Sequence, residues 1–407
     1  MTFSTSVSTY LRKFGYSSTT RIASNVDASL RLSIVVPAYN EELSLLLNSL
    51  ASCPLQNAQA VELIIVLNYP EDAPASVRDK HQQQWEQGRR ELKNGLKVHW
   101  LPAFELPRKK AGVGLARKIG MDESLRRFGE IDYNGLIVCL DADCSVSENY
   151  LESLLEAEKQ GVNGLSIYYE HPLELEDSVH KQAIVNYEIF LRYYAHALNK
   201  ANYPFPFQTV GSSMAARAKA YIKAGGMNKR KAGEDFYFLH QIFPQGLFRT
   251  WTHCTVYPSP RLSERVPFGT GKAMLASLGG EKDYSQLYNP ELFRQLGNWL
   301  SKPEFIYHHQ QRLWPPYVRH FLEVENYGPE LKDLIERSKN RVQFERNFFF
   351  WFNGFKVLKY LHANQRQAPD VKNIKACSDW LGTMASMPED LLNELRALER
   401  KAPFAYL

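Results

Sequence analysis

Two aspartates separated by one residue, Asp141 and Asp143, are the first candidates for chemistry in this sequence. They follow an apolar run, residues 136–140, that predicts a buried strand. Side chains alternate along an extended segment, so both carboxylates can project to the same side and flank one site. Carboxylates are typical ligands of Mg²⁺ or Mn²⁺, which usually also take waters and substrate phosphate oxygens. A turn or a helix cap also favours aspartate, and the pair alone leaves both interpretations open.

A second segment, residues 104–120, combines basic side chains with glycines. It reads FELPRKKAGVGLARKIG, and Gly112 and Gly114 separate the basic cluster that includes Lys110 from the one that includes Arg117. Glycines let backbone amides approach an anion, and the N-terminus of a following helix favours phosphate. The GxxxxGK[ST] pattern of a P-loop is absent. The segment therefore predicts either an anion-binding site or a solvated basic loop.

A further pair of acids, Glu234 and Asp235, comes just before apolar residues that recur at helical spacing over 236–243. This pattern places both acids at the start of an amphipathic helix. Acidic side chains stabilise helix N-termini electrostatically, which is one reason for their position. The alternative interpretation is chemical, because a carboxylate held rigidly at a helix start can act as a general base toward a hydroxyl.

The elements that must position these residues alternate between strand and helix patterns. Apolar runs predict strands at 32–39, 61–67, 96–101 and 136–140, with helices at 40–52 and 116–128 between them. This alternation favours an α/β fold with a Rossmann-like, mostly parallel sheet flanked by helices. Ligands of such sheets bind at the carboxyl ends of the strands. Residues 37–42, Asn68 and residues 141–143 would all lie along that edge.

The rest of the chain divides into three parts. We expect an N-terminal polar arm with loose structure at 1–30, an α/β domain at 31–272 and a mainly helical accessory region at 273–407. Within the α/β domain, a strand is predicted at 163–169 and a helix at 178–199. In the C-terminal region, the segment 345–363 places aromatic side chains between basic ones. It predicts either a helix face that contacts a membrane surface or, more in keeping with its spacing, a buried helix face.

Composition limits the possible partners and location. The 407 residues carry a net charge of +5, which does not suggest general nucleic-acid binding. Five cysteines occur without a CxxC pair, so neither a zinc site nor a disulfide framework is indicated. No apolar run approaches the ~18 residues that a membrane-spanning helix needs. We expect a soluble cytoplasmic protein, with peripheral contact at the inner face of the membrane as an option.

Taken together and in order, these segments resemble the inverting GT-A glycosyltransferases of glycosyltransferase family 2. The resemblance covers roughly residues 30–270 and is carried by IVVPAYNEE, GLARKIGMDES, CLDAD and GSSMAARAKAYIKAGGMNKRKAGED. It implies that the chain binds a nucleotide sugar through residues of these four segments. The residues matched to nucleotide-sugar binding are Pro37, Tyr39, Glu41, Lys110, Arg117, Asp141, Gly211 and Ser212, with Tyr39 near the base.

The resemblance also implies the remaining roles. Asp141 and Asp143 match the motif for Mn²⁺ or Mg²⁺, with Asp143 favoured as the direct ligand. Asp235 matches the catalytic base, and Glu234 would position hydroxyls of the acceptor or donor. Attack by the acceptor hydroxyl opposite the leaving nucleoside diphosphate would invert the sugar carbon. No QxxRW motif occurs, so we expect transfer of a single sugar.

Two features depart from the family pattern or extend it. Family members commonly carry aspartate after the second strand, where this sequence has Asn68, so the choice of nucleobase stays open. The basic segment 259–272 suggests that Arg261 or Arg265 closes over the diphosphate, although a surface loop is an equal alternative. The acceptor is undetermined and could be a glycan, a lipid-linked or a small molecule, as in cell-envelope polysaccharide or glycolipid assembly. The alternative function is a non-catalytic nucleotide- or glycan-binding module on this fold.

Overall fold

The apolar runs between residues 32 and 257 pair into one sheet in the computed structural model. The structure describes residues 2–16, 20–230, 233–263 and 269–406. The sheet contains β1 (Leu32–Ala38), β2 (Val61–Pro70), β3 (Lys97–Leu106), β4 (Leu136–Cys139), β5 (Ser145–Val146), β6 (Gly164–Tyr169), β7 (Met214–Arg217) and β8 (Phe248–Tyr257). The five strands predicted from the sequence are all present; β2 and β3 extend further than expected.

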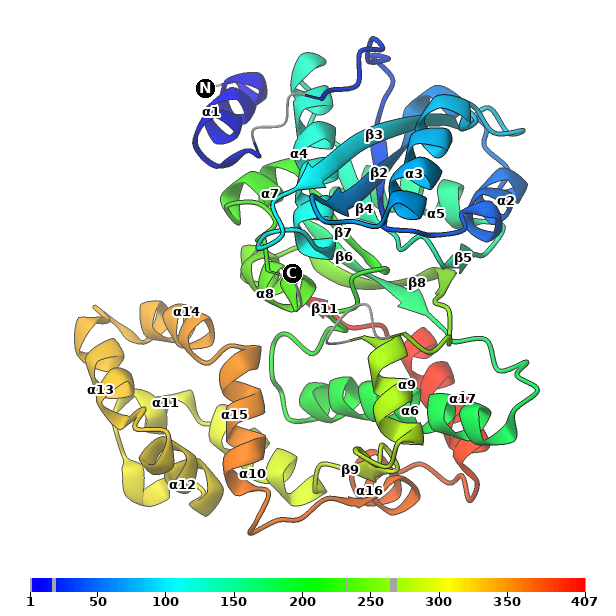
Figure 1. The fold of residues 1–407 in the computed structure, drawn as a ribbon. Helices are drawn as coiled ribbons and strands as arrows, with labels where there is room; N and C mark the ends of the chain where they lie inside the picture. Colours follow the sequence, from blue (N-terminus) through cyan, green and yellow to red (C-terminus); the bar gives the residue numbers. More distant parts are fainter. Residues whose placement is uncertain (1, 17–19, 231–232, 264–268, 407) are drawn as a thin grey trace. The chain divides into compact units, whose positions relative to one another are not determined.

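The strands follow the order β8-β6-β7-β4-β1-β2-β3, and β5 pairs with β8 (Figure 1). Parallel pairing joins β1 to β2 and β4, β2 to β3, and β6 to β8. Strand β7 runs antiparallel to β4 and β6. The expected α/β class with a mostly parallel sheet is therefore confirmed. Since Ala38 pairs with Leu67 and Val35 with Cys139, the carboxyl ends of β2, β1 and β4 share one edge.

The chain forms two compact units. Unit 1 comprises the described residues of 1–172 and 209–272, and unit 2 comprises 173–208 and 273–406. This division differs from the expected domain boundary in one segment, because 173–208 groups with the C-terminal helices. Helix α6 (Ser178–Lys200) explains the difference, since its apolar side packs on α10, α16 and α17 of unit 2.

Helices cover the sheet of unit 1. They are α1 (Phe3–Phe14), α2 (Ser44–Ser52), α3 (Ala75–Gln87), α4 (Val113–Glu130), α5 (Tyr150–Lys159), α7 (Ala218–Lys223) and α8 (Glu234–Ile242), with short 3₁₀ turns at Ala58–Ala60 and Phe243–Gln245. Helix α4 packs directly on β1 and β2 (Figure 1). A Cβ atom on Gly120 would lie 2.4 Å from Val35 Cγ1, so only glycine permits this approach. The tight packing fixes the start of α4 relative to the carboxyl edge of the sheet.

The prediction of a loosely structured N-terminal arm is wrong for the residues that form α1. Phe3, Val7 and Tyr10 recur at helical spacing and are buried, and Thr2 caps the helix. The Tyr10 hydroxyl donates to Asp122 Oδ1 of α4 at 3.1 Å, which burial of both groups strengthens. The Ser/Thr-rich composition concealed this amphipathic pattern. A short apolar stripe of this kind is enough to pack a helix against the rest of the protein.

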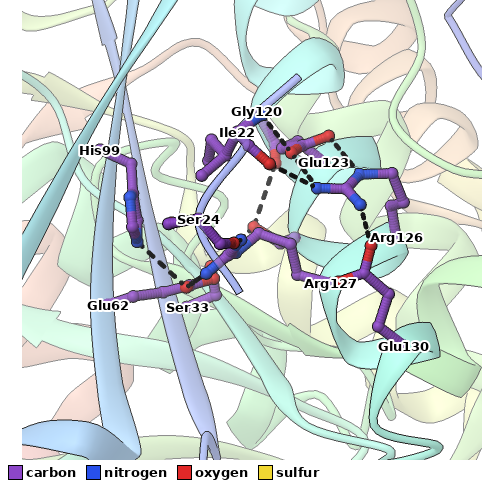
Figure 2. A network of polar contacts seen from close by, with 11 residues as sticks. Ile22, Ser24, Ser33, Glu62, His99, Gly120, Glu123, Arg126, Arg127 and Glu130 are labelled. Atoms are coloured by element: carbon purple, nitrogen blue, oxygen red, sulfur yellow. Dashed lines mark hydrogen bonds and ion pairs between the residues drawn. The ribbon is translucent and has the colours of Figure 1, made fainter. Parts of the chain in front are cut away.

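The following N-terminal segment is held by a polar network at the amino ends of the strands (Figure 2). Arg127 of α4 contacts Glu62 of β2 at 2.8 Å and donates to the Ser24 carbonyl at 2.9 Å. Ser33 donates to Glu62 at 3.0 Å, and His99 lies 3.5 Å from the same carboxylate. Burial tends to raise the pKa of Glu62, but hydrogen bonds from His99 and Arg127 outweigh it and lower the pKa. This network therefore stabilises the end of the sheet opposite the predicted ligand edge.

Unit 2 is mainly helical, as predicted for the C-terminal region. Besides α6 it contains most of α9 (Thr270–Leu278), α10 (Pro290–Leu300), α11 (Pro303–Tyr307), α12 (Pro316–Val324), α13 (Gly328–Arg337), α14 (Arg341–Trp351), α15 (Gly354–Asn364), α16 (Asn373–Leu381) and α17 (Pro388–Lys401). A 3₁₀ turn spans Gln311–Leu313, the short strands β9 (Gln286–Leu287) and β10 (Val371–Lys372) pair antiparallel, and β11 is Ala405–Tyr406.

The aromatic segment 345–363 lies on α14 and α15. Phe348 and Phe352 are buried and pack around Trp299, which confirms the buried-face interpretation for this side of the segment. Phe350 and Phe355 are exposed, so the option of membrane contact is not tested by the packing. In the part of the chain that the structure describes, no helix is both long and apolar enough to cross a bilayer.

Candidate functional site

Arg117 is the centre of the site because it joins two of the acidic motifs predicted from the sequence. It lies in the second turn of α4, and its side chain is 4% exposed. One guanidinium nitrogen contacts Asp141 Oδ1 at 2.5 Å, and another forms an ion pair with Glu234. Burial alone would lower the pKa of Arg117, but the two carboxylates raise it, so the side chain stays charged. The segment after β4 and the start of α8 are thereby brought to one point.

Two glycines make room for this ion-pair cluster. A Cβ atom on Gly211 would lie 2.4 Å from the Arg117 guanidinium, and one on Gly114 would lie 2.2 Å from the Arg230 carbonyl oxygen. Neither position has a positive φ, so the requirement for glycine comes from close packing. Gly211 was expected beside a donor sugar; the structure places it against Arg117. Gly114 lets α4 approach the segment that leads into α8.

Glu234 and Asp235 begin helix α8, as the sequence predicts. Gly233 precedes them in the left-handed conformation, with φ of 66°. Glu234 is buried against Arg117, whereas Asp235 is half-buried and accepts a hydrogen bond from the Phe236 N–H at 2.7 Å. Burial raises the pKa of both carboxyls, and Arg117 opposes the rise. A raised pKa makes Asp235 a stronger proton acceptor when it is ionised.

Arg261 forms a second cluster with Asp143 and Glu41. Its Nε lies 2.8 Å from Asp143 Oδ2, and its two terminal nitrogens donate to the Glu41 carboxylate at 2.6 and 2.9 Å. Burial, with Asp141 next in importance, raises the pKa of Asp143 to about 6, while Arg261 opposes the shift. Glu41 follows β1, Asp143 follows β4 and Arg261 follows β8, so three separate segments meet here. Arg265 lies outside the residues that the structure describes.

The two aspartates after β4 therefore each contact a different arginine. Among the described residues, no cluster of three or more His, Cys, Asp or Glu side chains could hold a metal ion. Asp141 and Asp143 supply two carboxylates, and Mg²⁺ or Mn²⁺ commonly takes one or two with substrate phosphates and waters. The donor set thus fits a cation shared with a diphosphate and does not fit one enclosed by protein ligands alone.

The loop after β1 is oriented by a residue that the sequence analysis did not identify. His81 of α3 is buried, and its Nε2 accepts a hydrogen bond from the Asn40 N–H at 3.0 Å. Burial and nearby Lys80 lower the pKa of His81 to about 4, so the ring remains neutral and able to accept. Asn40 adopts a left-handed conformation with φ of 52°, which the hydrogen bond helps to stabilise. A lone histidine on a polar helix gave no signal for this role.

The other predicted nucleotide-binding residues of the first two strands lie beside this loop. Pro37 is buried within β1, and Tyr39 is half-buried against a cluster formed by Tyr69, Ala73 and Val77. Asn68 is buried at the end of β2, where its amide nitrogen donates to the Ala38 carbonyl at 3.0 Å. That hydrogen bond joins the ends of β1 and β2. The proposed contact of Asn68 with a nucleobase would have to use its carbonyl oxygen.

The basic segment before α4 does not act as one patch. Lys110 is exposed in the turn that precedes the helix, whereas Arg117 is buried in the ion-pair cluster. Arg108 in the same turn forms an ion pair with Asp72 at 3.0 Å. Ser212 is buried, and its hydroxyl lies against the Cys144 thiol. Of the predicted basic pair, Lys110 alone is exposed and could reach an anion directly.

Comparison with known proteins gives one family match. Residues 33–223 match the family model described as glycosyl transferase family 2, and a search of curated proteins found no match. Among solved structures, the chain is similar to S. aureus TarS 1–349, with 12% identity over 83% of this chain and 92% of that chain, and a TM-score of 0.41. The structure of the same TarS fragment in complex with UDP-GlcNAc gives 12% identity, the same coverage and a TM-score of 0.42.

Proposed function

Residues 33–223 belong to glycosyl transferase family 2, and from this premise we propose a specific reaction for the site. The chain is a glycosyltransferase, and the reaction moves one sugar from a nucleoside-diphosphate sugar to an acceptor hydroxyl, with inversion at the sugar carbon. The observation that carries the proposal is the Arg117 cluster. The cluster links two acidic pairs. The pair after β4 is suited to hold a cation at the diphosphate of a donor, and the pair at the start of α8 is suited to activate the acceptor hydroxyl.

Asp235 is the base in this proposal. Its carboxylate takes the proton of the acceptor hydroxyl while the acceptor oxygen bonds to the sugar carbon. The bond from that carbon to the diphosphate breaks on the opposite face, and its electron pair leaves with the nucleoside diphosphate. Glu234, paired with Arg117, cannot turn freely and holds the start of α8 in place. Asp235 has no comparable ion pair among the described residues, which leaves its carboxylate available.

The donor is held by groups at the carboxyl edge of the sheet. We propose that the loop containing Tyr39 binds the nucleobase of the donor. Lys110 and Arg261 bind its diphosphate. Asp143, with Asp141, would hold Mn²⁺ or Mg²⁺, which when bound stabilises negative charge on a leaving diphosphate. We further propose a cytoplasmic location, because the five cysteines are buried and unpaired, as is usual in a reducing compartment. Cell-envelope polysaccharide or glycolipid assembly is the context we propose for the acceptor.

A thermal-shift panel tests the donor site. UDP, GDP, dTDP and CDP are each added with and without Mn²⁺. A diphosphate at 100 times its dissociation constant should stabilise the protein by about 2.7 kcal/mol. The absence of a shift with all four would refute the donor-site assignment.

The catalytic assignment is tested with Asp235→Asn. This variant should keep the diphosphate-induced shift but lose transfer and donor hydrolysis. The matched control is Asp79→Asn, which changes an exposed aspartate on α3 and should behave as wild type. Transfer by Asp235→Asn at the wild-type rate would show that another group is the base. Diphosphate binding by wild type with neither transfer nor hydrolysis of any donor would instead favour a non-catalytic binding module.

A further inference from the structure

Arg261 differs from Arg117 in how firmly it is held, although each arginine bridges two carboxylates. The Arg117 side chain is 4% exposed, and its partner Glu234 is equally buried. The Arg261 side chain is 38% exposed, and its partners Asp143 and Glu41 are 27% and 13% exposed. Solvent-exposed ion pairs contribute little net stability, whereas a buried charge cannot leave its partner without a large penalty. Arg117 is therefore fixed, and Arg261 can be exchanged for another cation.

The contacts of Arg261 coincide with groups that a donor and its cation would use. Its Nε contacts Oδ2 of Asp143, the proposed metal ligand. Its two terminal nitrogens form a bidentate pair with Glu41. The planar guanidinium suits phosphate oxygens as well as it suits carboxylates. A diphosphate at this edge would thus offer Arg261 an alternative partner at the moment when a divalent cation requires Asp143.

From this geometry we propose that Arg261 is an exchangeable counter-ion that competes with the divalent cation for Asp143 and couples cation binding to diphosphate binding. Without a donor, Arg261 partly neutralises Asp143 and Glu41 and weakens binding of the cation alone. When cation and diphosphate bind together, Arg261 transfers from the carboxylates to the diphosphate. The inference rests on the proposed function and adds a reason for Arg261 to contact both acids.

The coupling is reciprocal by thermodynamic necessity. The factor by which a diphosphate strengthens cation binding equals the factor by which the cation strengthens diphosphate binding. Removing the Arg261 charge should reduce this factor from both directions. It should tighten binding of the cation alone, because the competitor is lost, and weaken binding of the diphosphate with cation, because a phosphate partner is lost. A residue that only supports the loop would not change these two affinities in opposite directions.

The experiment measures Mn²⁺ binding to the full chain by electron paramagnetic resonance of free Mn²⁺, without nucleotide and then with each of the four diphosphates. The variants are Arg261→Gln and Arg261→Lys, and the charge-matched control is Arg12→Gln on the exposed side of α1. Thermal unfolding of each variant verifies folding. Allosteric couplings typically span about 5- to 150-fold. Arg261→Gln should therefore bind Mn²⁺ alone about 5-fold or more tightly than wild type, and bind the diphosphate with Mn²⁺ more weakly by a similar factor.

The outcomes separate this inference from the proposed function. Arg261→Lys, which keeps the charge but loses the bidentate geometry, should fall between Arg261→Gln and wild type. If Arg261→Gln binds Mn²⁺ alone no more tightly than wild type, or if neither protein binds Mn²⁺, the competition is refuted even when diphosphates still bind. If wild type binds none of the four diphosphates, the proposed donor site fails, whereas a gain in Mn²⁺ affinity in Arg261→Gln would still support competition at Asp143.

Discussion

Replacement of Arg117 by methionine is the most direct test of how the site is built. Methionine keeps most of the side-chain length but removes the charge that Asp141 and Glu234 share. Asp141 is 38% exposed, so water can replace Arg117 there and that half of the bridge contributes little. Glu234 is 4% exposed and would be left as an unpaired buried carboxylate. Removing one partner of a buried pair typically costs about 3–5 kcal/mol, and we expect about 3 kcal/mol for Arg117→Met at pH 8.

The loss should depend on pH in a direction that follows from the charges. Arg117 opposes the burial that raises the pKa of Glu234, so this pKa rises further in Arg117→Met. A carboxyl whose pKa is higher in the folded than in the unfolded state binds more protons when folded. Stability is therefore regained as the pH falls toward that pKa. The loss should therefore be smaller at pH 5 than at pH 8.

Urea unfolding monitored by circular dichroism at both pH values measures this loss. Arg117→Met/Glu234→Gln is the decisive companion variant. It removes both charges of the buried Arg117–Glu234 pair and should be more stable at pH 8 than Arg117→Met alone. Arg12→Gln, an exposed change on α1, should stay within about 0.5 kcal/mol of wild type. A loss below about 1 kcal/mol for Arg117→Met at pH 8, with no recovery in the double variant, would show that the cluster is not a buried ion-pair network.

Three further predictions concern His81 beside the loop after β1, Gly211 packed against Arg117, and the proposed catalytic base Asp235. The pKa of His81 is lowered from 6.5 to about 4, so between pH 7 and pH 5 the unfolded chain binds a proton that the folded chain does not. The free energy of unfolding should therefore fall by about 2 kcal/mol over this range because of His81. His81→Gln lacks this titration, so its stability relative to wild type should rise by that amount over the same range in urea unfolding; a constant difference would contradict the assignment. Gly211→Ala should cost about 1–3 kcal/mol because its Cβ would meet the Arg117 guanidinium at 2.4 Å, whereas Gly328→Ala, with open space around it, should be within about 0.5 kcal/mol of wild type. Burial raises the pKa of Asp235, so kcat/KM should fall as the pH drops through this raised pKa, and an acid limb at the ordinary carboxyl pKa would argue against Asp235 as the base.

The parts of the fold that could be predicted from sequence are those encoded locally. The runs that became β1 and β4 are short and apolar, and both strands are buried along their whole length. Their carboxyl ends define the ligand edge, so the placement of residues 141–143 followed from the strand assignment. Helix α8 starts at Glu234 as expected because two acids and a glycine precede an amphipathic pattern. In each case a stretch of about ten residues contains the whole signal.

The parts that could not be predicted depend on pairs of residues far apart in the chain. Arg117 lies in a basic segment that predicts either an anion-binding site or a solvated loop, yet it pairs with Glu234, which comes 117 residues later. His81 acts through a hydrogen bond to Asn40 that no local pattern encodes. Segment 173–208 joins unit 2 because the apolar face of α6 finds its partners after residue 290. Helix α1 is a different case, since the spacing of Phe3, Val7 and Tyr10 is local and was obscured by composition.

The charge balance at the carboxyl edge connects these observations to the proposed chemistry. The two clusters bring together Glu41, Asp141, Asp143 and Glu234, with Asp235 beside them, and among the described residues Arg117 and Arg261 are their ion-pair partners. Among the described residues of the two clusters, carboxylates already outnumber arginines, and a diphosphate would add further negative charge. Binding therefore requires positive charge that these ion pairs do not supply.

Arg117 cannot provide this positive charge, because leaving Glu234 unpaired is too costly. Among the described residues, the exposed Lys110 would contribute to this charge compensation, together with the proposed divalent cation at Asp143 and with Arg261 once that cation has displaced it. On this view Arg117 holds the two acidic segments together, and Arg261 couples binding of the cation to binding of the diphosphate.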